Sequence, residues 1–213
     1  MLKKIAKIAT IISIFLLSTS LPVMASEPQD SGSFDETIKE KELKKNIESC
    51  IKATMISEDG EEIELDVTEI TLTPIERVSV FSAAPPITTY AATAKVKTSK
   101  GSYKKNGISA NGVLTMNWTD VRGKKNKITR LKGYWSLAKG TFKSGKLYWG
   151  SDYTGPTFAP KKCSVGKDFD KSISYTSTAK TGKLKAHSIA YIKSPKNGKQ
   201  YQFSICVSPT IFS

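Results

Sequence analysis

A two-residue alternation of apolar and polar side chains is the sequence feature that most limits how this chain can fold. Near its end, Tyr201, Phe203, Ile205 and Val207 alternate with Gln202, Ser204 and Cys206. Successive side chains of a β-strand point to opposite faces of a sheet, so such a segment buries one face and exposes the other. The pattern recurs in 113–118 and 172–179, while 90–213 has no convincing helical period. These patterns predict a β-rich fold.

Turn signals divide this β-rich part of the chain into about seven short strands. The predicted turns are Asn106–Gly107, Asn111–Gly112, Ser144–Gly145, Thr181–Gly182 and Asn197–Gly198. Short strands between glycine-containing turns are typical of antiparallel sheets that pack face to face. We therefore expect 90–213 to form an antiparallel β-sandwich, or a partly open barrel, with Trp118 and Trp135 in its core.

Charge is divided very unevenly along the chain. The 213 residues include 33 Lys and Arg against 19 Asp and Glu, which gives a formal net charge of +14. Residues 26–82 contain 15 acidic and 6 basic side chains, whereas 83–213 contain 4 acidic and 24 basic ones. A compositional break of this size indicates two segments with different roles.

The first 25 residues have the features of an export signal. Lys3, Lys4 and Lys7 precede an apolar run over 8–17, which is shorter than the ~20 residues that a membrane span needs. Val23 and Ala25 suit the positions before a cleavage site, so we expect cleavage after Ala25 and secretion of the mature chain. The signal and the lysine bias are typical of extracellular proteins of Gram-positive bacteria.

The acidic segment, 26–82, predicts a small α+β unit. Apolar residues between Phe34 and Ile51 recur at helical spacing. Asp59–Gly60 separates two apolar runs, which indicates a β-hairpin whose second strand ends at Pro74. Residues 83–89, rich in Ala, Pro and Thr, are expected to link this segment to a basic domain at 90–213. The segment could also be a pro-region, removed by cleavage of the linker.

Few residues are suited to catalysis. His187 is the single histidine, and 83–213 contains four Asp and no Glu. A glycosidase of the two-carboxylate type would need Asp152 with Asp120, or Asp168 with Asp170. His187 could pair with Cys163 or with a serine, but no nucleophile-elbow or zinc-protease motif is present. We expect no enzyme activity, no cofactor and no metal site.

The three cysteines are too few for a disulfide-rich scaffold. Outside the cytoplasm a pair of them would tend to oxidise. Cys163 and Cys206 both lie in the basic part, so the simplest prediction is a Cys163–Cys206 disulfide. A bridge from Cys50 to either of them is the alternative.

Lysine-rich clusters are the best candidates for a binding surface. Their members are Lys124, Lys125, Lys127, Arg130 and Lys132 on one hairpin, Lys161, Lys162 and Lys167 in one loop, and Lys193, Lys196 and Lys199 on another hairpin. A strongly positive surface concentrates polyanions in a salt-dependent way. Arginine is scarce, so specific nucleic-acid recognition is not expected. The expected partner is an anionic cell-envelope polymer or an anionic membrane surface.

An aromatic segment suggests a possible contact with glycans. Trp149 and Tyr153 flank Asp152 in a Gly- and Pro-containing stretch. Exposed rings can stack on sugar faces and a carboxylate can accept hydroxyl hydrogen bonds, although aromatic rings are more often buried. The leading hypothesis is a secreted, non-enzymatic protein that binds an anionic polymer. The alternatives are a pro-protein of a toxin or bacteriocin-like factor with an acidic masking segment and, less favoured, an Asp-based hydrolase.

Overall fold

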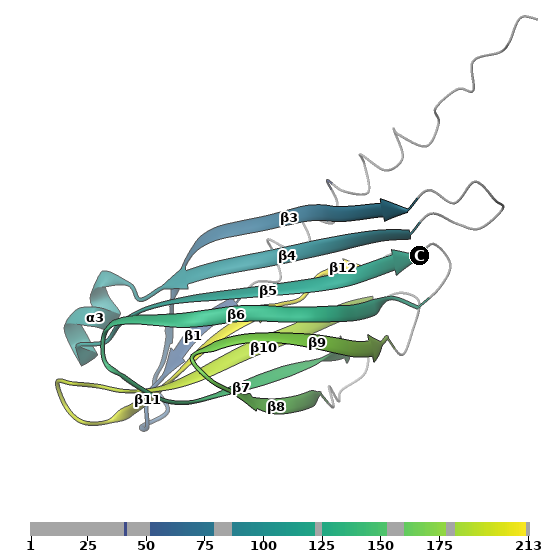
Figure 1. Ribbon diagram of the computed structural model, residues 1–213. Helices are drawn as coiled ribbons and strands as arrows, with labels where there is room; N and C mark the ends of the chain where they lie inside the picture. The colour runs from purple at the N-terminus through teal and green to yellow at the C-terminus, as the bar shows by residue number, and fades with distance from the viewer. Residues whose placement is uncertain are drawn as a thin grey trace, which may run out of the picture. The chain divides into compact units, whose positions relative to one another are not determined.

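The computed structural model describes residues 41, 52–78, 87–121, 125–152, 160–177 and 182–211. These residues form two antiparallel sheets packed together and one short helix, which confirms the predicted β-sandwich (Figure 1). The predicted signal peptide lies outside the described residues, as does the predicted helix at 34–51 apart from Lys41. Within the described part of the chain, no helix is long and apolar enough to cross a membrane.

Seven strands form one sheet and five form the other among the described residues. The first sheet has the order β2 (Glu62–Glu64), β1 (Lys52–Ile56), β11 (Gln200–Val207), β10 (Gly182–Lys193), β7 (Thr141–Asp152), β8 (Lys161–Val165), with β12 (Thr210–Ile211) also paired to β10. The second has the order β3 (Asp66–Val78), β4 (Ile87–Lys97), β5 (Ser109–Val121), β6 (Lys127–Lys139), β9 (Asp168–Thr176). Helix α3 (Lys100–Asn106) connects β4 to β5.

The acidic segment contributes strands to both sheets. β1 pairs with β11 from Lys52↔Cys206 to Ile56↔Gln202, and its Ala53 and Met55 are buried. β3 pairs with β4 along its length. The described part of the acidic segment therefore shares one core with the basic part, and 38–213 belong to one compact unit. The last residues of the predicted linker, 87–89, belong to β4.

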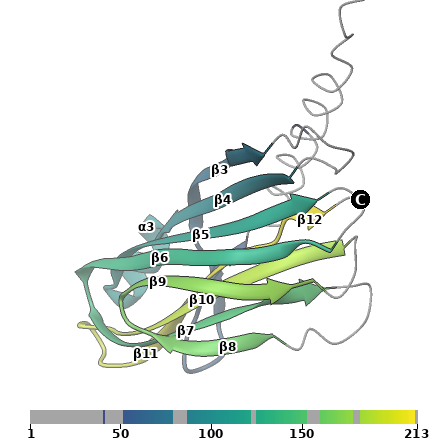
Figure 2. The ribbon, with the colours of Figure 1, turned by 45° about the vertical axis from the view of Figure 1, so that its right-hand side comes forward.

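The chain crosses between the sheets at two opposite edges. Leu65 alone separates β2 from β3, so these two edge strands lie on the same side of the sandwich. Gly166 and Lys167 alone separate β8 from β9, the edge strands of the other side (Figure 2). Backbone hydrogen bonds hold both crossings: Leu65 N donates to Ala53 O (2.9 Å), and Trp135 N donates to Lys167 O (2.9 Å).

The core between the sheets contains the two tryptophans expected there. Trp118 and Trp135 are fully buried, and Trp118 stacks on Tyr90 with ring centroids 5.4 Å apart. Trp135 Nε1 donates a hydrogen bond to Ser188 Oγ (3.1 Å), which joins β6 of one sheet to β10 of the other. This bond satisfies the one polar atom of the indole, so the ring can be buried without an unpaired donor.

Two of the predicted turns lie inside strands instead. Gly112 is in β5 and Gly145 is in β7. A Cβ atom at Gly112 would lie 2.6 Å from the Trp135 ring, and one at Gly145 would lie 3.0 Å from Val165 O. These glycines permit close packing, which is the other common reason for glycine within a strand. The predicted turns at Asp59–Gly60 and Asn197–Gly198 are confirmed as the β1–β2 and β10–β11 connections.

The structure also differs from the prediction in the length of one strand, the number of strands and the presence of one helix. β3 continues past Pro74 through an irregularity between Pro74 and Glu76, since an edge strand tolerates the missing N–H. Nine strands, not about seven, lie within the described residues after position 86. Helix α3 was not predicted: Ser99 caps its start, and Gly107, with φ 71°, ends it where a turn was expected.

Candidate functional site

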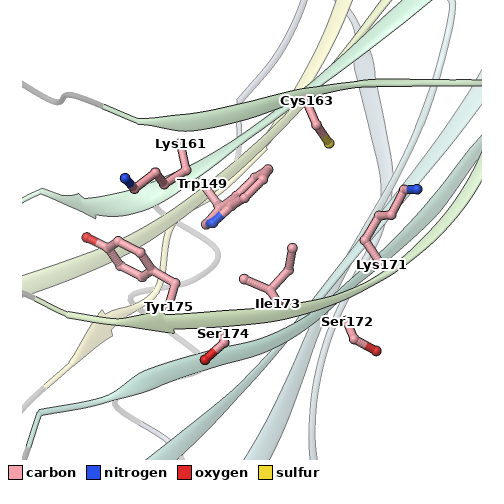
Figure 3. A pocket seen from close by; sticks show the side chains of 8 residues that line it. All are labelled: Trp149, Lys161, Cys163, Lys171, Ser172, Ile173, Ser174 and Tyr175. Carbon is pink, nitrogen blue, oxygen red and sulfur yellow. The ribbon is translucent and has the colours of Figure 1, made fainter.

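A groove lies at the edge of the sandwich where β8 and β9 leave the interior accessible. Its volume is about 410 Å³. One sheet contributes Trp149, Lys161 and Cys163, and the other contributes residues 171–175 of β9 (Figure 3). A volume of this size lies in the lower part of the range for small-molecule sites.

The wall from the seven-stranded sheet combines an indole with a lysine. Trp149 of β7 and Lys161 of β8 are direct partners in the register, so their side chains share the inner face. Leu147 and Cys163 form the next inward-facing pair. Trp149 and Cys163 are partly buried against the core, and Lys161 is exposed. The tryptophan is therefore neither a core residue nor a fully exposed one.

The opposite wall is the inner face of β9. Lys171, Ile173 and Tyr175 alternate along the strand and point into the groove, whereas Ser172 and Ser174 point away (Figure 3). Ile173 and Tyr175 pack partly against the core. Lys171 stands opposite the fully buried Leu131, an inward-facing position, yet its side chain is exposed. Its long aliphatic stem can cover apolar surface while the ammonium reaches water.

Tyr175 also ties the two walls together. Its hydroxyl oxygen accepts a hydrogen bond from Ser151 N (2.9 Å) and lies 2.8 Å from Ser151 Oγ. Ser151 belongs to β7 of the seven-stranded sheet, so this contact fixes the distance between the edges of the two sheets. The phenol ring is thereby held in place before any ligand binds.

The predicted lysine clusters are arranged differently from the expectation. Lys161 and Lys162 lie in a strand, not a loop, and occupy opposite faces: Lys162 is paired with Tyr148 on the outer face. Lys127 and Lys132 are exposed on β6, and Lys125 is exposed just before it. Lys124 lies outside the described residues.

Arg130 is engaged in an ion pair. Its Nε and Nη2 donate to the two carboxylate oxygens of Asp170 at 2.6 and 2.5 Å. These hydrogen bonds and the negative charge of Asp170 raise the pKa of Arg130, and the same hydrogen bonds with the positive charge of Arg130 hold the pKa of Asp170 below its ordinary value. Arg130 is therefore less available to a polyanion than the neighbouring lysines.

Carboxylates gather at the opposite edge. Residues 52–78 contain eight acidic and two basic side chains. In the described structure, ion pairs join this segment to lysines elsewhere: Glu69 to Lys95 (2.6 Å), Asp59 to Lys199 (2.7 Å) and Glu61 to Lys105. No ion pair within the described residues involves Lys161, Lys162, Lys167 or Lys171. The carboxylates of the β2/β3 edge therefore pair with lysines, whereas at the β8/β9 edge Asp170 pairs with Arg130 and these four lysines have no ion pair among the described residues.

The predicted Cys163–Cys206 disulfide is not formed. β7 and β10 lie between β8 and β11, so three strand spacings of ~4.8 Å separate the two cysteines, well beyond the ~7 Å limit for bridged Cα atoms. In addition, Cys163 faces the groove, while Cys206 alternates with the buried Ile205 and Val207 and faces outward. The alternative partner, Cys50, lies outside the described residues.

His187 lies on the outer face of β10, away from the groove. It is the register partner of Cys206 and Tyr148, and its ring centroid is 6.1 Å from that of Tyr148. Burial, helped by the charge of Lys185, lowers its pKa to about 4. The considered pairing with Cys163 is not present, because that thiol faces the groove on the inner side of the sheet.

The carboxylates considered for hydrolysis lie on three strands, Asp120 on β5, Asp152 on β7, and Asp168 and Asp170 on β9. Asp168 and Asp170 are exposed on β9, and Asp170 is bound by Arg130. Asp120 is buried near the end of β5. The side chain of Asp152 and all of Tyr153 lie outside the described residues. Within the part of the chain that the structure describes, no group of three His, Cys, Asp or Glu could hold a metal ion.

The sequence pointed to residues of one wall only, Trp149, Lys161 and Cys163, and did not predict the groove. Trp149 and Lys161 were candidates for separate reasons, and Lys171, Ile173 and Tyr175 were not candidates at all. The alternation over 172–179 already placed Ile173 and Tyr175 on one face, and Lys171 shares their parity. A lysine in phase with the buried residues of a strand was the available signal.

No family model, no curated protein and no solved structure matches this chain.

Proposed function

We propose that this protein is exported and binds an anionic polymer of the cell envelope through the edge formed by β7, β8 and β9. The observation that carries the proposal is the separation of charge across the sandwich. Acidic strands occupy one edge of both sheets, and their carboxylates pair with lysines nearby. The lysines of the opposite edge keep their charge available to a partner.

The distribution of these lysines favours a polymer over a small anion. Lys161 and Lys162 point to opposite faces of β8, Lys167 lies at the crossing to β9, and Lys171 points into the groove. A compact anion could contact few of them at once, whereas a flexible chain of charges can follow the edge. Such binding is electrostatic and weakens as salt screens it.

The pro-protein hypothesis fits the strand pairing less well. Release of the acidic segment would remove β1 and β2 from the edge of β11, and β3 from the edge of β4. It would also expose the residues that Ala53, Met55 and Leu65 cover. The pairing favours an acidic segment that stays in the mature protein as part of the sandwich.

Two matched triple variants test the proposal. One replaces Lys161, Lys167 and Lys171 by Gln; the other replaces Lys95, Lys105 and Lys199, which pair with the acidic segment. Both remove three charges. Binding to polygalacturonate is measured over a series of salt concentrations. The variant at Lys161, Lys167 and Lys171 should bind more weakly, and its slope of log affinity against log salt should fall by about one per lysine. The variant at Lys95, Lys105 and Lys199 should change neither the affinity nor the slope by much. Equal losses in both variants would contradict the proposal.

A further inference from the structure

The groove between β8 and β9 has features that a merely charged edge does not need. Trp149 and Tyr175 present rings from different sheets, and Ile173 lies next to Tyr175 on the β9 wall (Figure 3). Tyr175 is already fixed by Ser151. An ordered aromatic site binds a ring-shaped ligand with little loss of side-chain entropy.

The groove also has lysines on both sides of its aromatic part. Lys161 extends near Trp149 and Tyr175, and Lys171 lies toward the other end of the groove, near Cys163 (Figure 3). Both occupy inward-facing positions, at which Trp149 and Leu131 are their register partners. Their charges favour an anionic occupant, and their separation by apolar surface favours one with an uncharged face between its acidic groups.

We propose that the groove binds one acidic sugar ring of the polymer, with the apolar face of the sugar against Trp149 and its carboxylate at Lys161, the register partner of that tryptophan. This inference rests on the proposed function and names the unit that the groove selects. The faces of aromatic rings carry partial negative charge, which attracts the positively polarised C–H groups of a sugar. Lysine supplies a charge-assisted hydrogen bond to the carboxylate without the bidentate geometry of arginine.

The chain contains a built-in reporter for occupancy of the groove. Of its three tryptophans, Trp118 and Trp135 are 0% and 1% exposed, whereas Trp149 lines the groove. A ligand in the groove should shield Trp149 from acrylamide and change the intrinsic fluorescence. In a Trp149→Phe variant both responses should disappear.

β8 also provides a matched pair of variants. Lys161→Gln and Lys162→Gln remove the same charge from adjacent positions, one facing the groove and one facing outward. The probes are tetragalacturonate, neutral maltotetraose and inorganic polyphosphate, each titrated at low salt. For tetragalacturonate, Lys161→Gln should weaken binding by about tenfold, as expected for a lost charge-assisted hydrogen bond, and Lys162→Gln by less than about twofold. Maltotetraose should bind weakly, and polyphosphate should leave the quenching of Trp149 unchanged.

Other results would overturn the inference in distinguishable ways. Equal losses in the two variants, without shielding of Trp149, would mean that charge alone drives binding, so the polymer proposal would survive and the sugar site would not. If the Lys161→Gln and Lys171→Gln variants bind tetragalacturonate as the parent does but self-associate, these lysines serve to protect the sheet edges from pairing with other copies. Absence of binding by both polyphosphate and tetragalacturonate at low salt would overturn the proposed function as well.

Discussion

The β2/β3 and β8/β9 edges of this sandwich share the same kind of chain crossing but differ in the side chains that cover them. At each, the chain passes from an edge strand of one sheet to an edge strand of the other within one or two residues. At the β2/β3 edge the crossing residue is Leu65, which is buried, and nearby carboxylates pair with lysines. At the β8/β9 edge, lysines occupy inward-facing positions and a groove remains. The inward-facing side chains, not the topology, decide whether an edge is sealed or open to a ligand.

The largest expected effect follows from removing the acidic edge. Residues 87–213 produced alone should show no cooperative unfolding, because the fragment loses β1, β2 and β3 and the apolar residues they bury. Near-UV circular dichroism and thermal melting would measure this against the 26–213 chain.

The control for that experiment is the full chain cut between β3 and β4, which keeps both fragments present. With a protease site in place of 79–86, the two fragments should stay together in native buffer and separate in denaturant. A folded, freely released 87–213 fragment would contradict this account and favour the pro-protein hypothesis.

Buried side chains should contribute more to the unfolding free energy at the acidic edge than at the groove edge. Met55→Ala removes a fully buried side chain next to the acidic edge and should lower the unfolding free energy by about 2–5 kcal/mol. Ile173→Ala, in the wall of the groove, should cost less than about half of that, since the side chain is only partly buried. Urea denaturation measures both. A larger loss for Ile173→Ala would mean that the groove edge is packed as tightly as the sealed one.

The pH dependence of stability tests the environment of His187, which lies on the outer face of β10 between the two edges. His187 has a folded pKa of about 4 against 6.5 for an ordinary histidine. The unfolded chain therefore binds a proton first, so stability is complete above pH 6.5 and decreases as the pH falls toward 4. The loss should be on the order of 3 kcal/mol. In His187→Gln this contribution should be absent, and identical pH profiles would contradict a neutral, partly buried imidazole. Binding at the two edges is best compared above pH 6.5.

The smallest effect should come from the ion pairs of the acidic edge. Lys95→Gln and Lys199→Gln remove exposed partners of Glu69 and Asp59. Solvent screens such pairs, so the unfolding free energy should change within the error of a denaturation curve. A large loss of unfolding free energy in either variant would show that these ion pairs stabilise the fold of the edge.

The sequence predicted individual strands and turns better than it predicted which strands pair with one another. The alternation around Tyr201 and the Asp59–Gly60 pair correctly indicated a strand and a hairpin, because both signals depend on neighbouring residues. The pairing of β1 with β11 joins residues about 150 positions apart, such as Thr54 and Ser204, and no local pattern records it. The acidic composition of 26–82 suggested a separate segment, although its inward-facing Ala53 and Met55 belong to the common core.

The groove was harder to predict for the same reason. Its walls come from strands of different sheets, and the contact between Tyr175 and Ser151 exists only after the sheets have packed. The sequence favours a loop for Lys161 and Lys162 because Lys-Lys-Cys-Ser-Val has little apolar character, which is common in an edge strand. Gly112 and Gly145 resemble turn signals because the nearest atoms packed against them, in the Trp135 ring and at Val165 O, come from other strands, which the local sequence does not show.

Hydrogen exchange on the intact protein tests the central claim most directly. β8 and β9 are edge strands with backbone amides that have no neighbouring strand on one side, so a bound polymer should slow their exchange. On addition of polygalacturonate at low salt, we predict slower exchange within 161–176 and no change within 52–78. Protection of 52–78, or equal protection of both edges, would contradict the account.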